Sequence, residues 1–376
     1  MNTSLNKARI AGAKRIVVKV GSVLLVDGNT GTLHGAWLNS LGEDVATWRA
    51  RGQEVILVSS GAIALGRRYL GLKRGELKLE EKQAAAAAGM VRLSHAYQET
   101  FGQFDLSVAQ ILMTLDDSEN RRRYLNARST IMTLLKVGAV PLINENDTVA
   151  TDEIRFGDND RLAARVTAMV SADLLILLSD IDGLYTNDPT LDSSANLVPV
   201  VTEITTDIEA MAGKAVASDS SGGMPTKLAA AKQCLGAGCQ MVICEGRGEN
   251  PLTSLEGGSD CTWFLPTGNP QTARKRWISG SLQPVGTIII DDGAFTALKK
   301  GRSLLPAGVS RIEGNFQRGD AVIIMTPSDG EVGRGLSAYS SEDAKRIMGH
   351  KTDEIEGLLG YRGRDEMIHR DDLAIL

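Results

Sequence analysis

The residues best suited to chemistry lie in one stretch of eighteen, INENDTVATDEIRFGDND, at positions 143–160. An apolar run precedes this stretch and a helical pattern follows it, so it begins at the carboxyl end of an expected strand. Ligands of open α/β sheets bind beyond this end of the strands, and amides and carboxylates at this density suit a small polar substrate. An acidic, solvated loop is the alternative. The amide and carboxylate side chains are Asn144, Glu145, Asn146, Asp147, Asp152, Glu153, Asp158, Asn159 and Asp160.

Three other expected strand ends carry groups that could contact a phosphate, a carboxylate or a nucleotide. Lys19 lies near the end of the apolar run RIVVKV, where burial is costly without an anion; an edge-strand lysine is the alternative. SSGAIALG offers the hydroxyls and backbone N–H groups of Ser59, Ser60 and Gly61 at a helix N-terminus, which suits phosphate or carboxylate, or an ordinary N-cap. Ser179 and Asp180, in LLSDIDGLYTNDP, stand where a nucleotide could lie, although a plain loop has the same composition.

A glycine-rich helix start, SGGMPTKLAAAKQ, is the second strong signal. Gly222 and Gly223 let the backbone approach a ligand closely, and Pro225 suits the first turn of a helix. Lys227 in that turn opposes the helix dipole unless it holds a negative group. The segment therefore predicts a phosphate site. The sequence contains neither the P-loop pattern nor the protein-kinase motifs.

Short apolar runs alternate with longer amphipathic ones over most of the chain, which predicts a parallel sheet covered by helices on both faces. The run AAAAAG at 84–89 favours helix and has small side chains suited to tight packing. Strands are expected at 15–20, 54–60, 106–113, 139–145, 173–179 and 240–245. Helices are expected near 35–50, 61–70, 80–103, 118–137, 159–171 and 225–237.

The residue pattern of the chain changes after the segment 264–286. This segment holds three prolines and three glycines, which suggests a linker. Beyond it, short β runs separated by glycine turns predict a small β-rich domain. Helical patterns near 341–348 and 352–359 follow.

Composition narrows the class of protein. The 376 residues allow two domains, and 43% hydrophobic against 4% aromatic residues predicts an aliphatic core. The net charge is −5, and residues 281–376 carry 12 basic against 15 acidic side chains, which disfavours nucleic acid as a partner. No apolar run approaches a membrane span. The cysteines lack metal-site spacing, which fits a reducing cytoplasm: Cys234, Cys239, Cys244 and Cys261.

Taken together, the motifs resemble the amino acid kinase family and, within it, the branch that phosphorylates L-glutamate. The resemblance runs from about Arg15 to the C-terminus and is carried, in order, by VVKVGS, VSSGAIALG, RRRYLNAR, INENDTVATDEIRFGDND, LLSDIDGLYTNDP and SGGMPTK. From about Gln283 the chain resembles a PUA domain. The resemblance implies an α/β fold, a three-layer αβα sandwich with a mainly parallel central sheet, plus a small β-rich PUA-like barrel. The implied domains are a kinase domain at 1–266, a linker at 267–282 and a PUA-like domain at 283–376.

The resemblance also implies the reaction. ATP, carried with Mg²⁺, would phosphorylate the side-chain carboxylate of L-glutamate to L-glutamyl 5-phosphate, the first step of proline biosynthesis. Magnesium is expected on the ATP phosphates, with no dedicated protein ligands. A cytoplasmic homo-oligomer under feedback inhibition by proline is expected, with no membrane partner.

Roles follow for individual residues. Lys19 and Lys227 would flank the transferring phosphoryl group, with Asp160 holding both lysines, while Asp147 and Asp158 could accept from the substrate ammonium. Ser179 and Ser221 stand where threonine is common in the family, and Pro225 stands where a small residue is usual. The implied glutamate-binding residues are Ser60, Asn144, Asp147, Asp158 and Asn159. The implied ATP-binding residues are Lys19, Ser179, Asp180, Ser221, Gly222, Gly223, Met224, Pro225, Thr226 and Lys227.

Other interpretations stay open at this point. A sister kinase of the same fold could act on aspartate, acetylglutamate, carbamate or UMP, although the paired NEND and GDND motifs disfavour this. An RNA-binding protein and an inactive sensor of proline or glutamate are the alternatives from other classes.

Overall fold

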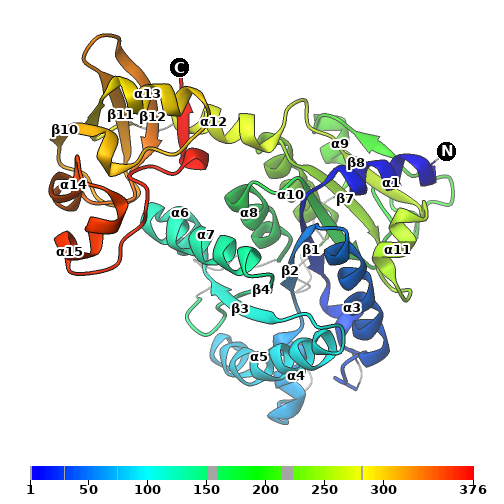
Figure 1. The fold of residues 1–376 in the computed structure, drawn as a ribbon. Helices are drawn as coiled ribbons and strands as arrows, with labels where there is room; N and C mark the ends of the chain where they lie inside the picture. Colours follow the sequence, from blue (N-terminus) through cyan, green and yellow to red (C-terminus); the bar gives the residue numbers. More distant parts are fainter. Residues whose placement is uncertain (1, 29, 74, 151–158, 214–222, 281–282) are drawn as a thin grey trace. The chain divides into compact units, whose positions relative to one another are not determined.

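The computed structural model describes residues 2–28, 30–73, 75–150, 159–213, 223–280 and 283–376. The chain forms two compact units (Figure 1). The first unit comprises Met1–Glu119 and Asn126–Pro270, and the second comprises Asn120–Leu125 and Gln271–Leu376.

The first unit is built around an eight-stranded sheet in the order β3-β4-β2-β1-β5-β7-β8-β6. Neighbouring strands run parallel except β7 and β8, which are antiparallel. The strands are β1 (Arg15–Val20), β2 (Glu54–Ser59), β3 (Val108–Met113), β4 (Val140–Glu145), β5 (Leu174–Ser179), β6 (Val200–Val201), β7 (Gln240–Glu245) and β8 (Cys261–Phe264).

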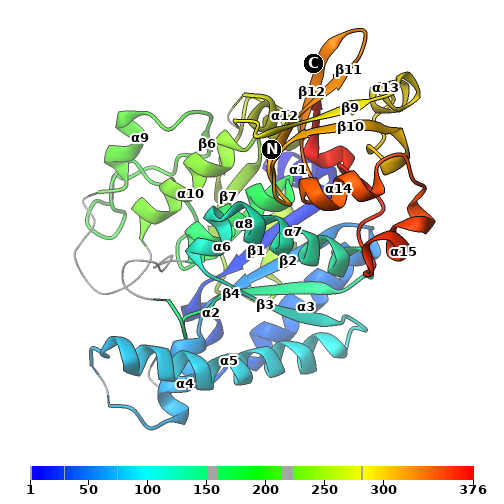
Figure 2. The same ribbon diagram turned by 90° about the vertical axis from the view of Figure 1, so that its left-hand side faces the viewer.

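Both faces of this sheet are covered by helices, because its central strands are apolar along their whole length. In Figure 2, α3 and α5 lie on one side of the strands and α7 and α8 on the other. The helices are α1 (Asn2–Gly12), α2 (Ser22–Leu25), α3 (Gly35–Ala50), α4 (Ala62–Tyr69), α5 (Leu79–Gly102), α6 (Leu115–Glu119), α7 (Arg121–Lys136), α8 (Asn159–Val170), α9 (Thr206–Met211), α10 (Met224–Gly236) and α11 (Pro251–Glu256).

Strand alternation decides where Lys19 points. Ile16, Val18 and Val20 of β1 join the core that also contains side chains of α3 and α5. Successive side chains of a strand point to opposite faces, so Val17 and Lys19 face the other side, which α8 covers. A lysine on an otherwise apolar, buried strand is thereby aimed at the start of a helix.

Helices α4 and α5 approach each other through backbone rather than side chains. A Cβ atom on Gly66 would lie 1.7 Å from the carbonyl oxygen of Ala85, and one on Gly89 would lie 1.7 Å from that of Ala62. The small residues of the AAAAAG run therefore allow a close helix crossing, as expected from their size. Because α4 starts directly after β2, this crossing also fixes the turn between them.

The second unit contains a five-stranded sheet in the order β10-β9-β11-β12-β13, in which β9 and β11 are parallel and the other pairs antiparallel. Its strands are β9 (Gly286–Ile290), β10 (Val309–Gly314), β11 (Ala321–Thr326), β12 (Gly330–Leu336) and β13 (Leu373–Ile375). Its helices are α12 (Pro270–Gly280), α13 (Asp292–Lys299), α14 (Ser341–Ile347) and α15 (Ile355–Leu359), with 3-10 turns η1 (Pro306–Gly308), η2 (Thr352–Glu354) and η3 (Arg370–Asp372).

The predicted fold class is confirmed, and all six expected strands of the first unit form within two residues of their predicted ends. The segment expected to be a linker forms helix α12, which opens at Pro270, a favoured first helical position, and continues through TARKRW, a run that tolerates helix well. Several elements were not predicted, strand β8 and helix α1 among them. Strand β8 has only four residues and α1 is polar, so neither carries a clear periodic signal.

Candidate active site

The polar motifs meet at one edge of the first unit's sheet. Since β1, β2, β4 and β5 are parallel, their carboxyl ends lie at the same edge. Helices α8 and α10, which contact each other, both begin there. The N-terminus of a helix carries a partial positive charge and unpaired N–H groups. This edge therefore combines strand ends, helix starts and the polar side chains that stand out in the sequence.

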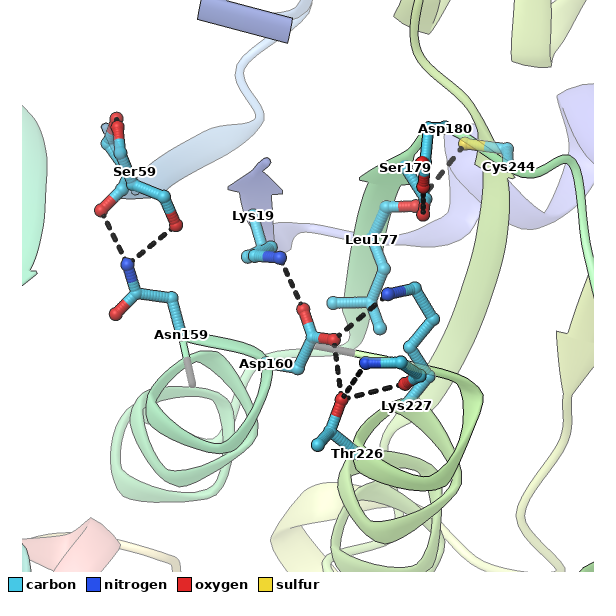
Figure 3. Close-up of polar contacts among 12 residues, drawn as sticks. Lys19, Ser59, Asn159, Asp160, Leu177, Ser179, Asp180, Thr226, Lys227 and Cys244 are labelled. Atoms are coloured by element: carbon cyan, nitrogen blue, oxygen red, sulfur yellow. Dashed lines mark hydrogen bonds and ion pairs between the residues drawn. The ribbon is translucent and has the colours of Figure 1, made fainter. Parts of the chain in front are cut away.

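A buried carboxylate joins the two lysines (Figure 3). Asp160, in the first turn of α8, lies with Oδ1 2.6 Å from Nζ of Lys19 on β1 and with Oδ2 3.2 Å from Nζ of Lys227 on α10. Asp160 is fully buried and each lysine is 7% exposed. Three segments far apart in the sequence thus form one charged cluster.

The cluster carries one excess positive charge. Burial by itself would raise the pKa of Asp160, but the charges of Lys19 and Lys227 and their hydrogen bonds outweigh burial and hold this pKa below its usual value. Among the residues that the structure describes, each lysine ammonium bonds only to Asp160. An ammonium has three donors, so both lysines keep donors for a further acceptor. A buried site with surplus cationic donors suits an anionic ligand.

The first turn of α10 is shaped by its own side chains. Thr226 Oγ1 accepts a hydrogen bond from the Gly223 N–H (3.2 Å) and donates to the Gly223 carbonyl oxygen (2.8 Å). Thr226 also lies 3.4 Å from Oδ2 of Asp160. Pro225 occupies the second helical position, where no backbone donor is needed. Gly223, with φ −148° and ψ −177°, is extended and exposed, which leaves its backbone open to a ligand.

Two asparagines converge on the end of β2. Asn144, at the end of β4, donates from Nδ2 to the Ser59 carbonyl oxygen at 2.6 Å, and Asn159, at the start of α8, donates to the same oxygen at 2.9 Å. Nδ2 of Asn159 also donates to Ser60 Oγ at 2.7 Å. The structure therefore brings Ser60, Asn144 and Asn159 together beside the charged cluster.

The end of β5 carries the expected nucleotide-binding residues. Ser179 is buried, and its hydroxyl donates to Oδ1 of Asp180 at 3.2 Å. Asp180 is exposed, and its Oδ2 atom lies 3.7 Å from Nη2 of Arg247. The Ser179 carbonyl accepts from the Gly246 N–H at 2.8 Å, which ties the end of β5 to the segment after β7.

The remaining predicted residues divide into two groups. Asp147 is half-buried in the turn that follows β4, and Met224 opens α10. Three predicted residues lie outside the described part of the chain: Asp158, Ser221 and Gly222.

Tyr97 was not predicted from the sequence, and Ser59 was expected to offer its hydroxyl to an anion rather than its carbonyl to two amides. The Ser59 carbonyl receives both asparagine amides, and its hydroxyl lies 3.1 Å from the hydroxyl of Tyr97 on α5. Ser59 precedes Ser60 in the SSGAIALG motif, but nothing in the motif distinguishes the role of its carbonyl. Tyr97 occupies an ordinary buried position of an amphipathic helix, so its spacing gave no signal that set it apart from core residues.

Neither a metal-binding cluster nor a membrane-spanning helix occurs in the part of the chain that the structure describes. Over those residues, no three His, Cys, Asp or Glu side chains are grouped so that they could hold a metal ion. Likewise, none of the described helices is both long and apolar enough to cross a membrane.

Comparison with known families agrees with this geometry. The model of the amino acid kinase family matches residues 14–245, and that of the PUA domain matches residues 286–359. The sheet edge with its lysine–aspartate–lysine cluster lies within the first match. The chain belongs to the amino acid kinase family.

Several relatives carry one common name. A protein of Paramagnetospirillum magneticum, named glutamate 5-kinase, is 61% identical over 97% of this chain and 99% of its own length. Proteins with the same name from Bradyrhizobium sp. and Rhodopseudomonas palustris are 58% and 56% identical, over 98% and 99% of this chain and 97% and 99% of their own lengths. The similarity therefore covers both units.

Proposed function

We propose that this protein is an enzyme that transfers the terminal phosphoryl group of ATP to the side-chain carboxylate of L-glutamate. The product would be L-glutamyl 5-phosphate, which opens the route from glutamate to proline. The observation that carries the proposal is the buried cluster of Lys19, Asp160 and Lys227 beside the amides of Asn144 and Asn159. Full-length identity of 56–61% to proteins named glutamate 5-kinase supports the choice of substrate.

The chemistry needs positive charge more than it needs a base. A glutamate side chain has a pKa of about 4.3 and is already ionised at neutral pH. The reaction therefore brings an anionic nucleophile to an anionic phosphoryl group, and catalysis consists of positioning and charge neutralisation. A cluster with one excess positive charge and free ammonium donors supplies both. We assign Lys19 and Lys227 to the transferring phosphoryl group.

Asp160 acts through the two lysines in this proposal. Its two carboxylate oxygens each bind one ammonium group, so the carboxylate sets the spacing between them. The lowered pKa keeps Asp160 ionised at neutral pH. Without this anion, two buried ammonium groups would repel each other across the site.

Glutamate is assigned to the polar groups at the ends of β2 and β4. Ser60, Asn144 and Asn159 offer a hydroxyl and two amides, and Asp147 stands in the turn beyond β4. Asp158, the residue before Asn159, completes the proposed set. The carboxylates suit the substrate ammonium, and the hydroxyl and amides suit its polar groups.

ATP is assigned to the end of β5 and to the start of α10. Ser179 and Asp180 form one part of this proposed site, and residues 221–227 form the other. A thirteen-residue helix that begins directly after Gly223 presents backbone N–H groups to phosphate oxygens. The magnesium ion would arrive with the nucleotide, because both oxygens of Asp160 are already engaged by lysines and Mg²⁺ needs few protein ligands. Bound Mg²⁺ would neutralise charge on the ATP phosphates.

An assay of two products tests the reaction. Release of ADP is followed with purified protein and ATP, and the acyl phosphate is trapped with hydroxylamine as its hydroxamate. Both signals should appear with L-glutamate and stay near background with aspartate, acetylglutamate, carbamate or UMP. Comparable turnover of any of these four, or ADP release without a trapped acyl phosphate, would contradict the assignment.

The localisation, the oligomeric state, the inhibition by proline and the domain bounds are proposed from the resemblance to the family. We expect a cytoplasmic enzyme, a homo-oligomer, and inhibition by proline, and we retain a kinase domain at 1–266, a linker at 267–282 and a PUA-like domain at 283–376. Sedimentation would measure the oligomeric state, and the glutamate assay with added proline would measure inhibition. A monomer, or activity that proline leaves unchanged, would contradict the respective proposal.

A further inference from the structure

A polar network lies beneath the proposed glutamate-binding residues. The carbonyl oxygen of Ser59 accepts from Nδ2 of both Asn144 and Asn159, at 2.6 and 2.9 Å. Each amide is thereby oriented with its nitrogen toward Ser59 and its oxygen away from it, as the Asn159 side chain shows in Figure 3. The Asn144 Oδ1 atom is buried and has no hydrogen-bond partner among the described residues. One backbone carbonyl thus sets the direction of two amides in the proposed substrate site.

The hydroxyl groups of Ser59 and Tyr97 form hydrogen bonds that stabilise the turn after β2. The Ser59 hydroxyl lies 3.2 Å from the Ser60 carbonyl oxygen, which can only accept, and 3.1 Å from the Tyr97 hydroxyl. Because a serine hydroxyl has one proton, Ser59 donates to Ser60 and Tyr97 donates to Ser59. Burial raises the pKa of Tyr97, so this donor keeps its proton.

The turn of residues 59–61 is restricted further by the backbone conformation of Gly61 and by the packing of α4 and α5. Gly61, the residue that follows Ser60, has φ 104°, a left-handed conformation that favours glycine. Tyr97 is fully buried, and the centroid of its ring lies 5.5 Å from that of Phe101. The backbone crossing at Gly66 and Gly89 locks α4 onto α5, which carries Tyr97. The phenol is therefore a rigid donor aimed at a short turn.

We propose that Tyr97 is a positioning residue for glutamate binding, which acts through Ser59 on the amides of Asn144 and Asn159. The inference rests on the proposed function and deepens it. Tyr97 is fully buried, and its hydroxyl bonds to Ser59, whereas the two lysines bond to Asp160. The Tyr97 hydroxyl fixes the turn of residues 59–61, and this turn fixes the two amides before the substrate arrives. Such pre-organisation reduces the cost of ordering the site on binding.

The test is Tyr97→Phe, which keeps the packed ring and removes the donor. The KM for glutamate should rise about tenfold, because one net hydrogen bond contributes about 1.4 kcal/mol and that is a tenfold change in binding. The kcat and the KM for ATP should stay within about twofold, since the lysine cluster is untouched. Ser59→Ala should raise the same KM, and the double variant should be no worse than the more damaging single one.

A matched control separates positioning from general stability. Tyr339 of the second unit is also a buried tyrosine whose hydroxyl donates to a backbone carbonyl, that of Arg364. Tyr339→Phe should lower the Tm to a similar extent and leave the KM for glutamate unchanged. An unchanged KM for glutamate in Tyr97→Phe, an equal rise in the KM values for glutamate and ATP, or additive effects in the double variant would overturn the proposal. Absence of glutamate-dependent ADP release by the unmodified protein would instead overturn the proposed function.

Discussion

Two buried ion clusters, one in each unit, differ in how their charge is balanced. In the first unit, one carboxylate, Asp160, holds two lysines. In the second unit, Arg274 on α12 holds one carboxylate, Asp372, at 2.6 Å. The other two nitrogens of Arg274 are engaged as well: Nε donates to the Asp371 carbonyl at 2.9 Å, and Nη1 donates to the Tyr124 hydroxyl at 3.2 Å.

The difference separates a structural ion pair from a binding site. The pair in the second unit is neutral, and arginine's planar fork is matched by fixed acceptors, so it needs no ligand. The cluster in the first unit keeps an excess positive charge on two compact ammonium groups whose donors are only partly used. Burying this excess positive charge costs free energy, and a bound anion that completes the cluster during function would offset that cost. Charge balance therefore identifies the candidate active site more clearly than burial does.

The largest effect is expected from breaking the neutral pair. Arg274→Leu should lower the free energy of unfolding of the second unit by about 3–5 kcal/mol, because Asp372 would stay buried while losing the opposite charge of Arg274. Urea denaturation measures this change. Arg311→Leu, at an exposed ion pair with Glu313 in the same unit, is the control and should change stability by less than about 0.5 kcal/mol. A similar small loss in both variants would mean that burial of the Arg274 pair has no special energetic role.

Removing one lysine should affect catalysis more than stability. Lys227→Met should lower kcat about a hundredfold or more, the scale of one lost transition-state donor. Stability should be unchanged or higher, because Lys19 and Asp160 would remain as a neutral pair. Steady-state kinetics and urea denaturation measure the two effects. Lys232→Met, on the exposed side of the same helix, should change neither; a near-normal kcat in Lys227→Met would remove this lysine from the mechanism.

Substrate binding should be separable from the charged cluster. Asp147→Ala should raise the KM for glutamate about tenfold, the effect of losing about 1.4 kcal/mol of binding, and leave the KM for ATP nearly unchanged. Both constants come from initial rates at saturating concentrations of the other substrate. Equal increases in the two constants would argue that Asp147 supports the whole site rather than glutamate.

The smallest effect concerns acid stability. The pKa of Asp160 is lower in the folded protein than its usual value near 3.9. Its contribution to stability is therefore fully present above about pH 3.9 and is lost as the pH falls through the folded-state pKa. Lys227→Met removes one of the charges that lower this pKa, so the loss on acidification should be smaller and complete at a higher pH. Urea midpoints between pH 7 and pH 2 test this, and superimposable profiles would contradict it.

Much of the candidate site could be predicted from the sequence. Lys19, Asp160 and Lys227 stand out there because each combines a charged side chain with a strand end or a first helical turn. Their roles remain predictions, but their meeting at one sheet edge is observed. The part proposed for Tyr97 could not be predicted, because helical periodicity reports only that a residue is buried. Its partner Ser59 is 38 positions away, on another element.

Local sequence signals account for the features that could be predicted, and long-range contacts account for those that could not. The apolar runs, glycines and helix starts are short-range features, and they were enough to predict the main strands, the main helices and the polar edge. The folded chain alone reveals that helix α12 forms within the expected linker segment and that α1 joins the first unit through Asn6, whose side chain accepts from Trp263. It also reveals that one carbonyl, that of Ser59, receives amides from residues 85 and 100 positions further on. Such contacts depend on how separate elements pack, and no spacing along the chain encodes them.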